Sequence, residues 1–234
     1  MVELSVILPV YNERVTLPIL LSKWSRAIKK LKITYEFVLC EDGSTDGTQE
    51  IIKSLKYKYP ISLNQKKVKR GYGKAVQDGI KQAKGKWLLS IDSDGQCDPL
   101  DLKKFWKEKK KNEISIGWRV KRADSALRRY MSFAFRILFQ VLFPNNYIHD
   151  PSAPFVLYEK NNILKYIDSD LSKMAEGFWW GFVAMSYKRK IKISEIKIHH
   201  HPRYSGITQV YRISSLPRII LNNIFGLIQI KFSK

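Results

Sequence analysis

Short apolar runs alternate with amphipathic segments over the first hundred residues, and this alternation restricts the possible folds more than any other feature. The apolar runs are rich in Val, Ile and Leu and end in polar or Gly-containing turns, which is typical of buried strands. The expected strands are Leu4–Val10, Tyr35–Cys40, Ile61–Asn64 and the run that begins at Trp87. The segments between them place apolar residues at helical spacing. An α/β fold with a mostly parallel sheet, flanked by helices on both faces, is therefore predicted.

Polar residues end or follow three of these expected strands. Pro9, Tyr11 and Glu13 stand at the end of the first strand, Asp42 follows the second, and Asp92 follows the fourth. In open parallel sheets, ligands bind beyond the carboxyl ends of the strands. These side chains are therefore predicted to line one rim of the sheet, although they are far apart in the sequence.

The motif at the end of the fourth strand, Asp92-Ser93-Asp94-Gly95-Gln96, predicts a metal site. In an extended chain, residues i and i+2 point to the same side, so Asp92 and Asp94 are expected to aim at one point. Two carboxylates at one point suit Mg²⁺ or Mn²⁺, and the amide oxygen of Gln96 is a candidate third ligand. An Asp-rich turn that caps the next helix is the structural alternative, because Asp and Gly are common turn residues.

The chain carries a large excess of positive charge. It has 42 Lys and Arg residues against 21 Asp and Glu residues, which gives a formal net charge of +21. Such an excess predicts attraction to polyanions, which include nucleic acid, anionic lipid and phosphorylated substrates. The basic residues are dispersed and form no known nucleic-acid reader motif, so no nucleic-acid partner is expected.

Two long apolar helices are expected in the second half, at Leu127–Phe143 and Leu216–Phe232. Each has a narrow polar stripe, which is typical of helices that lie in a membrane interface. The alternative for the first is a core or dimer helix. The alternative for the second is docking onto the domain or onto a separate membrane-spanning subunit. We therefore expect an α/β domain at residues 1–210 and a membrane- or partner-binding tail at residues 211–234.

Other sequence features bear on localisation. Cys40 and Cys97 form no CxxC pair, which fits a reduced, cytoplasmic setting. The apolar start Val2–Val10 lacks a basic leader and is not expected to be a signal peptide. No apolar run reaches the roughly 20 residues that span a bilayer. We therefore expect a cytoplasmic chain that binds peripherally to the cytoplasmic face of an anionic membrane.

Three motifs, in this order, resemble those of the family 2 glycosyltransferases, which have the GT-A fold. They are Val6–Glu13, Glu41–Thr48 and Asp92–Gln96. All three in order are far more specific than any one alone. The resemblance implies that residues 1–210 form a GT-A (Rossmann-like) glycosyltransferase domain that takes a nucleotide sugar as donor.

Within that family the chain looks most like the polyprenol-phosphate sugar transferases of the dolichyl-phosphate mannosyltransferase type. The segments that carry this likeness are Gln96, Gly117-Trp118-Arg119 and residues 203–208. The likeness implies metal-dependent, inverting transfer of a sugar from GDP-mannose or a UDP-hexose to a polyprenyl or dolichyl monophosphate. The alternative is a family 2 enzyme that adds a sugar to a glycan hydroxyl in polysaccharide or glycolipid synthesis.

The resemblance also implies a role for each matching residue. The nucleotide sugar would be bound by Pro9, Tyr11, Glu13, Cys40, Asp42, Asp92, Ser93, Asp94, Arg119 and Arg203. Mg²⁺ or Mn²⁺ would be held by Asp92, Asp94 and Gln96. The catalytic residues would be Asp94, Asp150 and Arg203.

The acceptor determines whether a general base is needed. A phosphate monoester already carries between one and two negative charges at neutral pH, because its second pKa is about 6. Its approach to a second anion is therefore the main difficulty, and arginine side chains pair with phosphate oxygens bidentately. The candidates for binding the acceptor phosphate are Arg119, Arg128, Arg129 and Arg203. Asp150 is then expected to be a positioning group rather than an obligatory base.

Overall fold

Seven strands form one sheet in the computed structural model, which describes residues 1–121, 126–144, 148–164, 177–205 and 216–233. The strands are β1 (Leu4–Val10), β2 (Tyr35–Asp42), β3 (Ile61–Lys66), β4 (Trp87–Ser90), β5 (Ile114–Arg119), β6 (Val156–Glu159) and β7 (Ile193–Ile198). Their order across the sheet is β3-β2-β1-β4-β6-β5-β7. β6 runs antiparallel to both of its neighbours, and every other pairing is parallel. The predicted mostly parallel α/β fold is confirmed.

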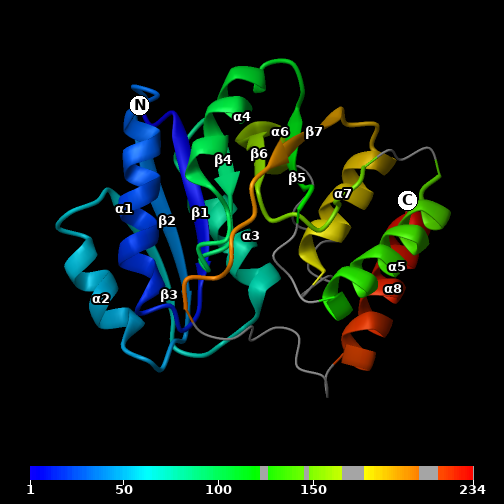
Figure 1. The fold of residues 1–234 in the computed structure, drawn as a ribbon, viewed down its shortest axis with the longest axis horizontal. Coiled ribbons are helices and arrows are strands. Elements are labelled where there is room, and N and C mark those ends of the chain that lie inside the picture. The colour runs from blue at the N-terminus through cyan, green and yellow to red at the C-terminus, as the bar shows by residue number, and fades with distance from the viewer. Residues whose placement is uncertain (122–125, 145–147, 165–176, 206–215, 234) are drawn as a thin grey trace.

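Helices cover both faces of this sheet (Figure 1). They are α1 (Thr16–Lys29), α2 (Thr48–Leu55), α3 (Tyr72–Gln82), α4 (Leu102–Glu108), α5 (Ala126–Leu142), α6 (Lys160–Leu164), α7 (Phe178–Lys188) and α8 (Leu216–Phe232), with a short 3₁₀ turn, η1 (Pro99–Asp101), before α4. The two long apolar helices expected in the second half are α5 and α8. The predicted division between residues 210 and 211 lies outside the described residues.

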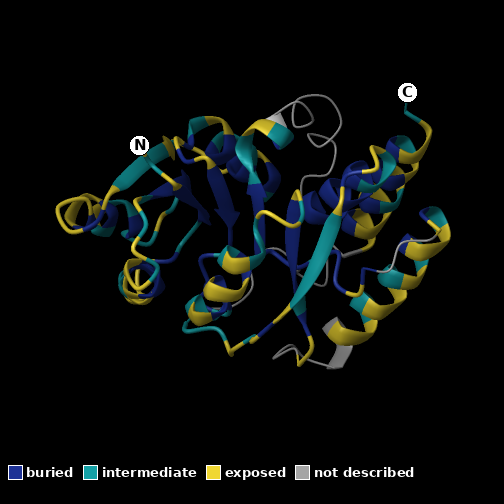
Figure 2. Ribbon diagram, turned by 90° about the horizontal axis from the view of Figure 1, so that it is seen from above, coloured by how far each residue is buried: buried dark blue, intermediate teal, exposed yellow. Residues whose placement is uncertain are grey.

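The two faces of the sheet pack against separate hydrophobic layers. Along β1, Leu4, Val6 and Leu8 belong to the layer under α1, α2 and α4, whereas Ile7 belongs to the layer with α3 and α7. This alternation is the period of two expected of a strand that is buried on both sides. Figure 2 shows the buried central strands and the exposed residues on the outer sides of the helices.

Helix α7 lies in the interior, whereas α5 and α8 form an outer layer beside it. The α7 residues Trp179 and Trp180 are both buried, and the ring of Trp180 packs edge-on against Phe135 of α5 at a centroid distance of 4.3 Å. α8 contacts both α5 and α7. Among the helices of the described residues, none is both long enough and apolar enough to cross a membrane.

Candidate active site

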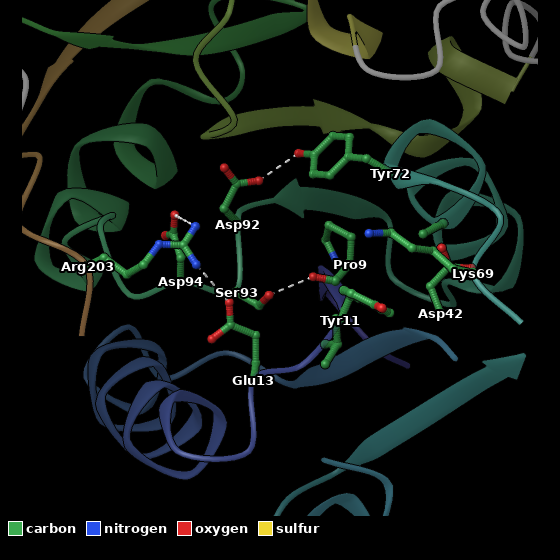
Figure 3. Close-up of a pocket in the computed structure, with 12 residues that line it drawn as sticks. Pro9, Tyr11, Glu13, Asp42, Lys69, Tyr72, Asp92, Ser93, Asp94 and Arg203 are labelled. Atoms are coloured by element: carbon green, nitrogen blue, oxygen red, sulfur yellow. Dashed lines mark hydrogen bonds and ion pairs between the residues drawn. The ribbon is translucent and has the colours of Figure 1, made fainter. Parts of the chain in front are cut away.

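A pocket opens at the carboxyl ends of β1, β2 and β4 (Figure 3). It contains about 680 Å³ of space, which includes open solvent at its mouth. Its lining consists of Pro9, Val10, Tyr11, Glu13, Asp42, Lys69, Tyr72, Ala75, Asp92, Ser93, Asp94 and Arg203. Eight of the ten residues predicted to bind the nucleotide sugar are therefore in one pocket; Cys40 and Arg119 are not in its lining.

Asp92 and Asp94 both face this pocket from the turn that follows β4 (Figure 3). Burial, and after it the negative charge of Asp94, raises the pKa of Asp92 to about 7. The chain forms a turn at Ser93 and Asp94, so this turn brings the two carboxylates to the pocket, and not the alternation of an extended chain on which the prediction relied. Ser93, between Asp92 and Asp94, donates a hydrogen bond to the carbonyl oxygen of Pro9 at 2.7 Å, which ties the turn to the end of β1.

The charge of the pocket is opposite to the charge of the chain. Four carboxylates line it, those of Glu13, Asp42, Asp92 and Asp94, against the two cations of Lys69 and Arg203. Fully ionised, the lining carries 2 − 4 = −2 in a chain of net charge +21. An anionic diphosphate would be repelled from such a pocket unless a cation neutralised the carboxylates.

Asp92 and Asp94 suit a divalent cation in this setting. Their oxygens are the hard ligands that Mg²⁺ and Mn²⁺ prefer, and the cation would relieve the repulsion that raises the pKa of Asp92. One oxygen of Asp92, Oδ1, accepts a hydrogen bond, and its other oxygen has no hydrogen-bond partner among the described residues. The donor set therefore fits the predicted metal.

Arg203 reaches the pocket from the segment that follows β7. Its Nη1 donates to Glu13 Oε1 at 3.2 Å and its Nη2 donates to Asp94 Oδ2 at 3.1 Å. The segment is docked on the turn after Asp94: the N–H of Tyr204 donates to the carbonyl oxygen of Asp94 at 3.2 Å, and the N–H of His201 donates to that of Gln96 at 2.8 Å. One guanidinium therefore joins two carboxylates that are far apart in the sequence.

Asp42 occupies the other end of the pocket, near Tyr11 and Lys69 (Figure 3). Its Oδ2 accepts hydrogen bonds from the backbone N–H groups of Arg70 and Gly71 at 2.9 and 2.8 Å. Its Oδ1 is buried and has no hydrogen-bond partner among the described residues. Lys69 Nζ lies 3.8 Å from the centre of the Tyr11 ring. A buried acceptor without a donor is costly, so Asp42 is suited to an N–H group of a bound ligand.

Sequence reasoning missed Lys69 and Tyr72. Lys69 lies between β3 and α3, and Tyr72 is the first residue of α3, so the rule that placed Asp42 and Asp92 at the carboxyl edge applies to them as well. Nothing in the local pattern of this segment distinguishes residues that face the pocket from their neighbours. Arg70, for example, pairs with Asp42 and Asp78 instead.

Two predicted residues lie next to the pocket rather than in its lining. Cys40 is buried in β2 against α3, where a Cβ at Gly79 would come within 2.7 Å of its sulfur. Gln96 donates from Nε2 to the carbonyl oxygen of His201 at 3.1 Å. The predicted role of Gln96 as third metal ligand remains a prediction.

Arg119 and Asp150 form a buried ion pair. Arg119 Nε and Nη2 donate to Asp150 Oδ2 and Oδ1 at 2.7 and 2.8 Å, and Nη2 also donates to Ser152 Oγ at 2.7 Å. The charge of Arg119 lowers the pKa of Asp92, although burial outweighs it, so the pair lies near the paired aspartates. Arg129 is exposed on α5, and the side chain of Arg128 lies outside the described part of the structure.

Solved structures share this fold. Glucosyl-3-phosphoglycerate synthase from Mycobacterium tuberculosis, solved in complex with Mn²⁺, uridine diphosphate and phosphoglyceric acid, superposes with a TM-score of 0.72 at 17% identity over 98% of this chain and 78% of that one. TarS residues 1–349 from S. aureus, solved with UDP, superposes with a TM-score of 0.65 at 19% identity over 98% of this chain and 65% of that one. The protein is therefore an α/β protein of the GT-A class.

The chain belongs to glycosyl transferase family 2, whose family model matches residues 5–166. It is 28% identical over 229 residues to dodecaprenyl-phosphate galacturonate synthase from Rhizobium johnstonii, across 94% of this chain and 65% of that protein. It is 32% identical over 179 residues to dolichyl-phosphate beta-glucosyltransferase from Dictyostelium discoideum, across 68% of this chain and 54% of that protein. The matched regions thus span 54–65% of the length of these two relatives.

Proposed function

We propose that the chain transfers a sugar from a nucleoside diphosphate sugar to a polyprenyl monophosphate at a membrane surface. The observation that carries this proposal is the acidic pocket in which Arg203 joins Asp94 and Glu13. Relatives that are named as dodecaprenyl- and dolichyl-phosphate transferases support the lipid acceptor.

The donor would bind along the pocket from Asp42 to Asp94. Oδ1 of Asp42, which accepts no hydrogen bond from the described residues, would accept one from an N–H of the base, which uracil and guanine both offer. The solved neighbours with bound UDP favour a UDP-hexose as donor, with GDP-mannose as the alternative. Lys69 and Tyr11 lie beside Asp42 and would contact the nucleoside.

The diphosphate would lie over Asp92 and Asp94. These two residues, together with Gln96, would hold Mg²⁺ or Mn²⁺, which supplies Lewis-acid stabilisation of the charge that develops on the leaving diphosphate. Without substrate, Arg203 makes a single hydrogen bond to each of Asp94 and Glu13, whereas a phosphate group can pair bidentately with its planar fork. We therefore expect Arg203 to turn to the diphosphate.

The acceptor phosphate would attack the anomeric carbon from the face opposite the diphosphate. A bond forms between a phosphate oxygen and the anomeric carbon, the bond from that carbon to the diphosphate breaks, and the configuration inverts. Asp150 is bound bidentately by Arg119, which favours the ionised carboxylate but makes it a weak base. This supports a positioning role for Asp150 and Arg119.

The lipid acceptor requires the chain to reach a membrane, and the outer layer of α5 and α8 is suited to this. Exposed large apolar side chains follow one another at helical spacing on each helix: Tyr130, Phe133, Ile137 and Val141 on α5, and Leu221, Phe225, Ile228 and Phe232 on α8. Apolar side chains flanked by basic residues are typical of helices that lie in a membrane interface. We propose peripheral binding of this face, the α5–α8 face, to anionic lipid on the cytoplasmic side.

The test is an incubation of the chain with a panel of radiolabelled nucleotide sugars, Mn²⁺ or Mg²⁺, and polyprenyl phosphate, followed by extraction of lipid. We expect label in the lipid phase, dependence on the divalent cation, and a loss of at least about a hundredfold in Asp94→Asn, since removing a mere hydrogen-bond partner of a metal ligand costs about 10–100-fold. Glu108→Gln, on the exposed side of α4, is the matched control. No label in lipid, with label transferred to a glycan in a parallel incubation that contains one, would contradict the proposal and favour a sugar hydroxyl as acceptor.

A further inference from the structure

The side chains of Trp179, Tyr72 and Asp92 form a chain of hydrogen bonds that ends at Asp92, one of the two carboxylates proposed to hold the metal. Figure 3 shows the hydrogen bond between Tyr72 and Asp92. Trp179 Nε1 of α7 donates to the Tyr72 hydroxyl oxygen at 2.8 Å, and this hydroxyl donates to Asp92 Oδ1 at 2.7 Å. We propose that Tyr72, oriented by Trp179, is a positioning residue that sets the orientation of Asp92 for the divalent cation. The inference rests on the metal dependence of the proposed function.

The chemistry of the three groups determines the direction of the hydrogen bonds. The indole N–H of Trp179 is a donor and has no acceptor atom, so it must donate to the oxygen of Tyr72. The hydroxyl of Tyr72 has a single proton, and this proton is then directed to Asp92. Asp92 Oδ1 is therefore an acceptor in this arrangement, which leaves the other carboxylate oxygen of Asp92 to face a cation.

Asp92 needs such a restraint more than Asp94 does. Asp94 accepts hydrogen bonds from Arg203 at 3.1 Å and from the N–H of Gln96 at 3.0 Å. Asp92 accepts only from Tyr72 among the described residues, and it is repelled by Asp94. Without the hydroxyl of Tyr72, the carboxylate of Asp92 would be free to rotate away from Asp94.

The two donors are held by rigid parts of the fold. Tyr72 is the first residue of α3. Trp179 is 4% exposed, and its ring packs edge-on against those of Phe178 and Phe182 at centroid distances of 5.0 and 5.4 Å. A ligand orientation that is set by fixed outer partners is the arrangement that raises metal affinity in proteins.

The experiment removes one hydrogen-bonding group at a time and measures Mn²⁺ binding directly. Tyr72→Phe deletes only the hydroxyl, and Trp179→Phe deletes the indole N–H. The matched control is Tyr158→Phe, because this buried hydroxyl hydrogen-bonds to Ser90 Oγ at 2.8 Å but lies outside the pocket lining. Free Mn²⁺ is followed by electron paramagnetic resonance in the presence of UDP, and thermal melting without metal checks that each variant is folded.

We expect Tyr72→Phe to weaken Mn²⁺ binding by about 10–100-fold, and Trp179→Phe to weaken it less. The double variant should match Tyr72→Phe within about twofold, because Trp179 acts through Tyr72 and the two effects are not additive. Transfer by Tyr72→Phe should recover at saturating Mn²⁺ with little change in the KM for the nucleotide sugar. Tyr158→Phe should bind Mn²⁺ like the unchanged chain.

The possible failures are distinguishable. Equal Mn²⁺ affinity of Tyr72→Phe and Tyr158→Phe would overturn the positioning role of Tyr72 alone. Additive effects of the two substitutions would overturn the role of Trp179. A lack of Mn²⁺ binding by the unchanged chain would overturn the proposed metal dependence and this inference with it.

Discussion

Burial in the pocket changes the pKa of a single residue, Glu13, by a large amount. Its side chain is buried beside Arg203, and its N–H donates to Thr48 Oγ1 at 2.9 Å. Burial raises the pKa of Glu13 from 4.5 to about 7, despite the opposing effects of a hydrogen bond to Thr16 and of the charge of Arg203. A carboxylate of this kind destabilises the fold when it ionises.

The consequence is a pH dependence of stability in the metal-free chain. The folded state binds the proton of Glu13 more tightly than the unfolded state does. The stabilisation of the fold that results is therefore complete below pH 4.5 and is lost as the pH rises through about 7. Glu13→Gln removes the contribution. We therefore expect the free energy of unfolding of Glu13→Gln, relative to the unchanged chain, to rise by about 1–3 kcal/mol between pH 5 and pH 8.

Urea denaturation at a series of pH values, with a chelator present, measures this difference. Glu108→Gln serves as the control, because Glu108 lies outside the pocket lining and its carboxylate is partly exposed beside Lys111. A difference for Glu13→Gln that stays constant over the whole range would show that the pKa of Glu13 is not raised.

At the scale of elements, the pocket depends on a contact between two loops, the segment after β7 and the turn after β4. Residues 200–205 lie across the turn after Asp94: Cys97 and His200 form an isolated bridge, and Tyr204 sits over Gly95. The hydroxyl of Tyr204 accepts a hydrogen bond from Lys23 Nζ of α1 at 2.9 Å. This docking brings Arg203 to Asp94.

Gly95→Ala should disrupt the docking. Gly95 has a φ of +81°, and a Cβ there would lie 2.4 Å from a ring atom of Tyr204. Backbone strain and the clash together are expected to cost about 2–4 kcal/mol of stability and to lower transfer by displacing Arg203. Chemical denaturation and the lipid-transfer assay measure the two effects.

Gly47→Ala separates strain from contact. Gly47 has a similar positive φ, of +88°, but a Cβ there would meet only the flexible side chain of Arg14, at 3.3 Å. We expect a smaller loss of stability than for Gly95→Ala. Equal losses would mean that the contact with Tyr204 contributes nothing.

At the scale of the whole molecule, charge and apolar surface are separated in a way that suits a membrane. The pocket is acidic, whereas the chain carries +21. The α5–α8 face lies beyond α7, at the far end of the sheet from α1 and α2 (Figure 1). Basic charge attracts the chain to anionic lipid at about 1 kcal/mol for each residue near the surface, and the apolar side chains then enter the interface.

Vesicle sedimentation tests this orientation. The chain should sediment with vesicles of phosphatidylcholine and phosphatidylglycerol at low salt and be released as salt rises, because salt screens the attraction. Phe133→Ser combined with Phe225→Ser should weaken binding roughly tenfold, since each ring loses burial worth about 1 kcal/mol or less in the interface. Tyr57→Ser, which removes a ring that is 95% exposed after α2, should have no such effect. A chain that stays in the supernatant at low salt would contradict the proposal.

The amino-acid sequence is sufficient to predict the order of strands and helices and many of the residues that line the pocket. Alternating apolar runs require a layered sheet, and the carboxyl ends of its strands must share one edge, so Pro9, Asp42 and Asp92 could be placed together before any coordinates. Asp92 and Asp94 both line the pocket, but a turn presents them and not the extended strand that the i, i+2 argument assumed. The antiparallel insertion of β6 between β4 and β5 has no such local signature.

The partners of these residues depend on packing between distant segments. Arg203 joins Glu13 and Asp94, Arg119 is bound to Asp150, and Tyr72 receives the indole N–H of Trp179. Each of these contacts spans many residues of chain, and no spacing rule predicts which donor meets which acceptor. Local periodicity therefore determined the architecture and the acidic edge, whereas the docking of separate segments determined how each charge on that edge is paired.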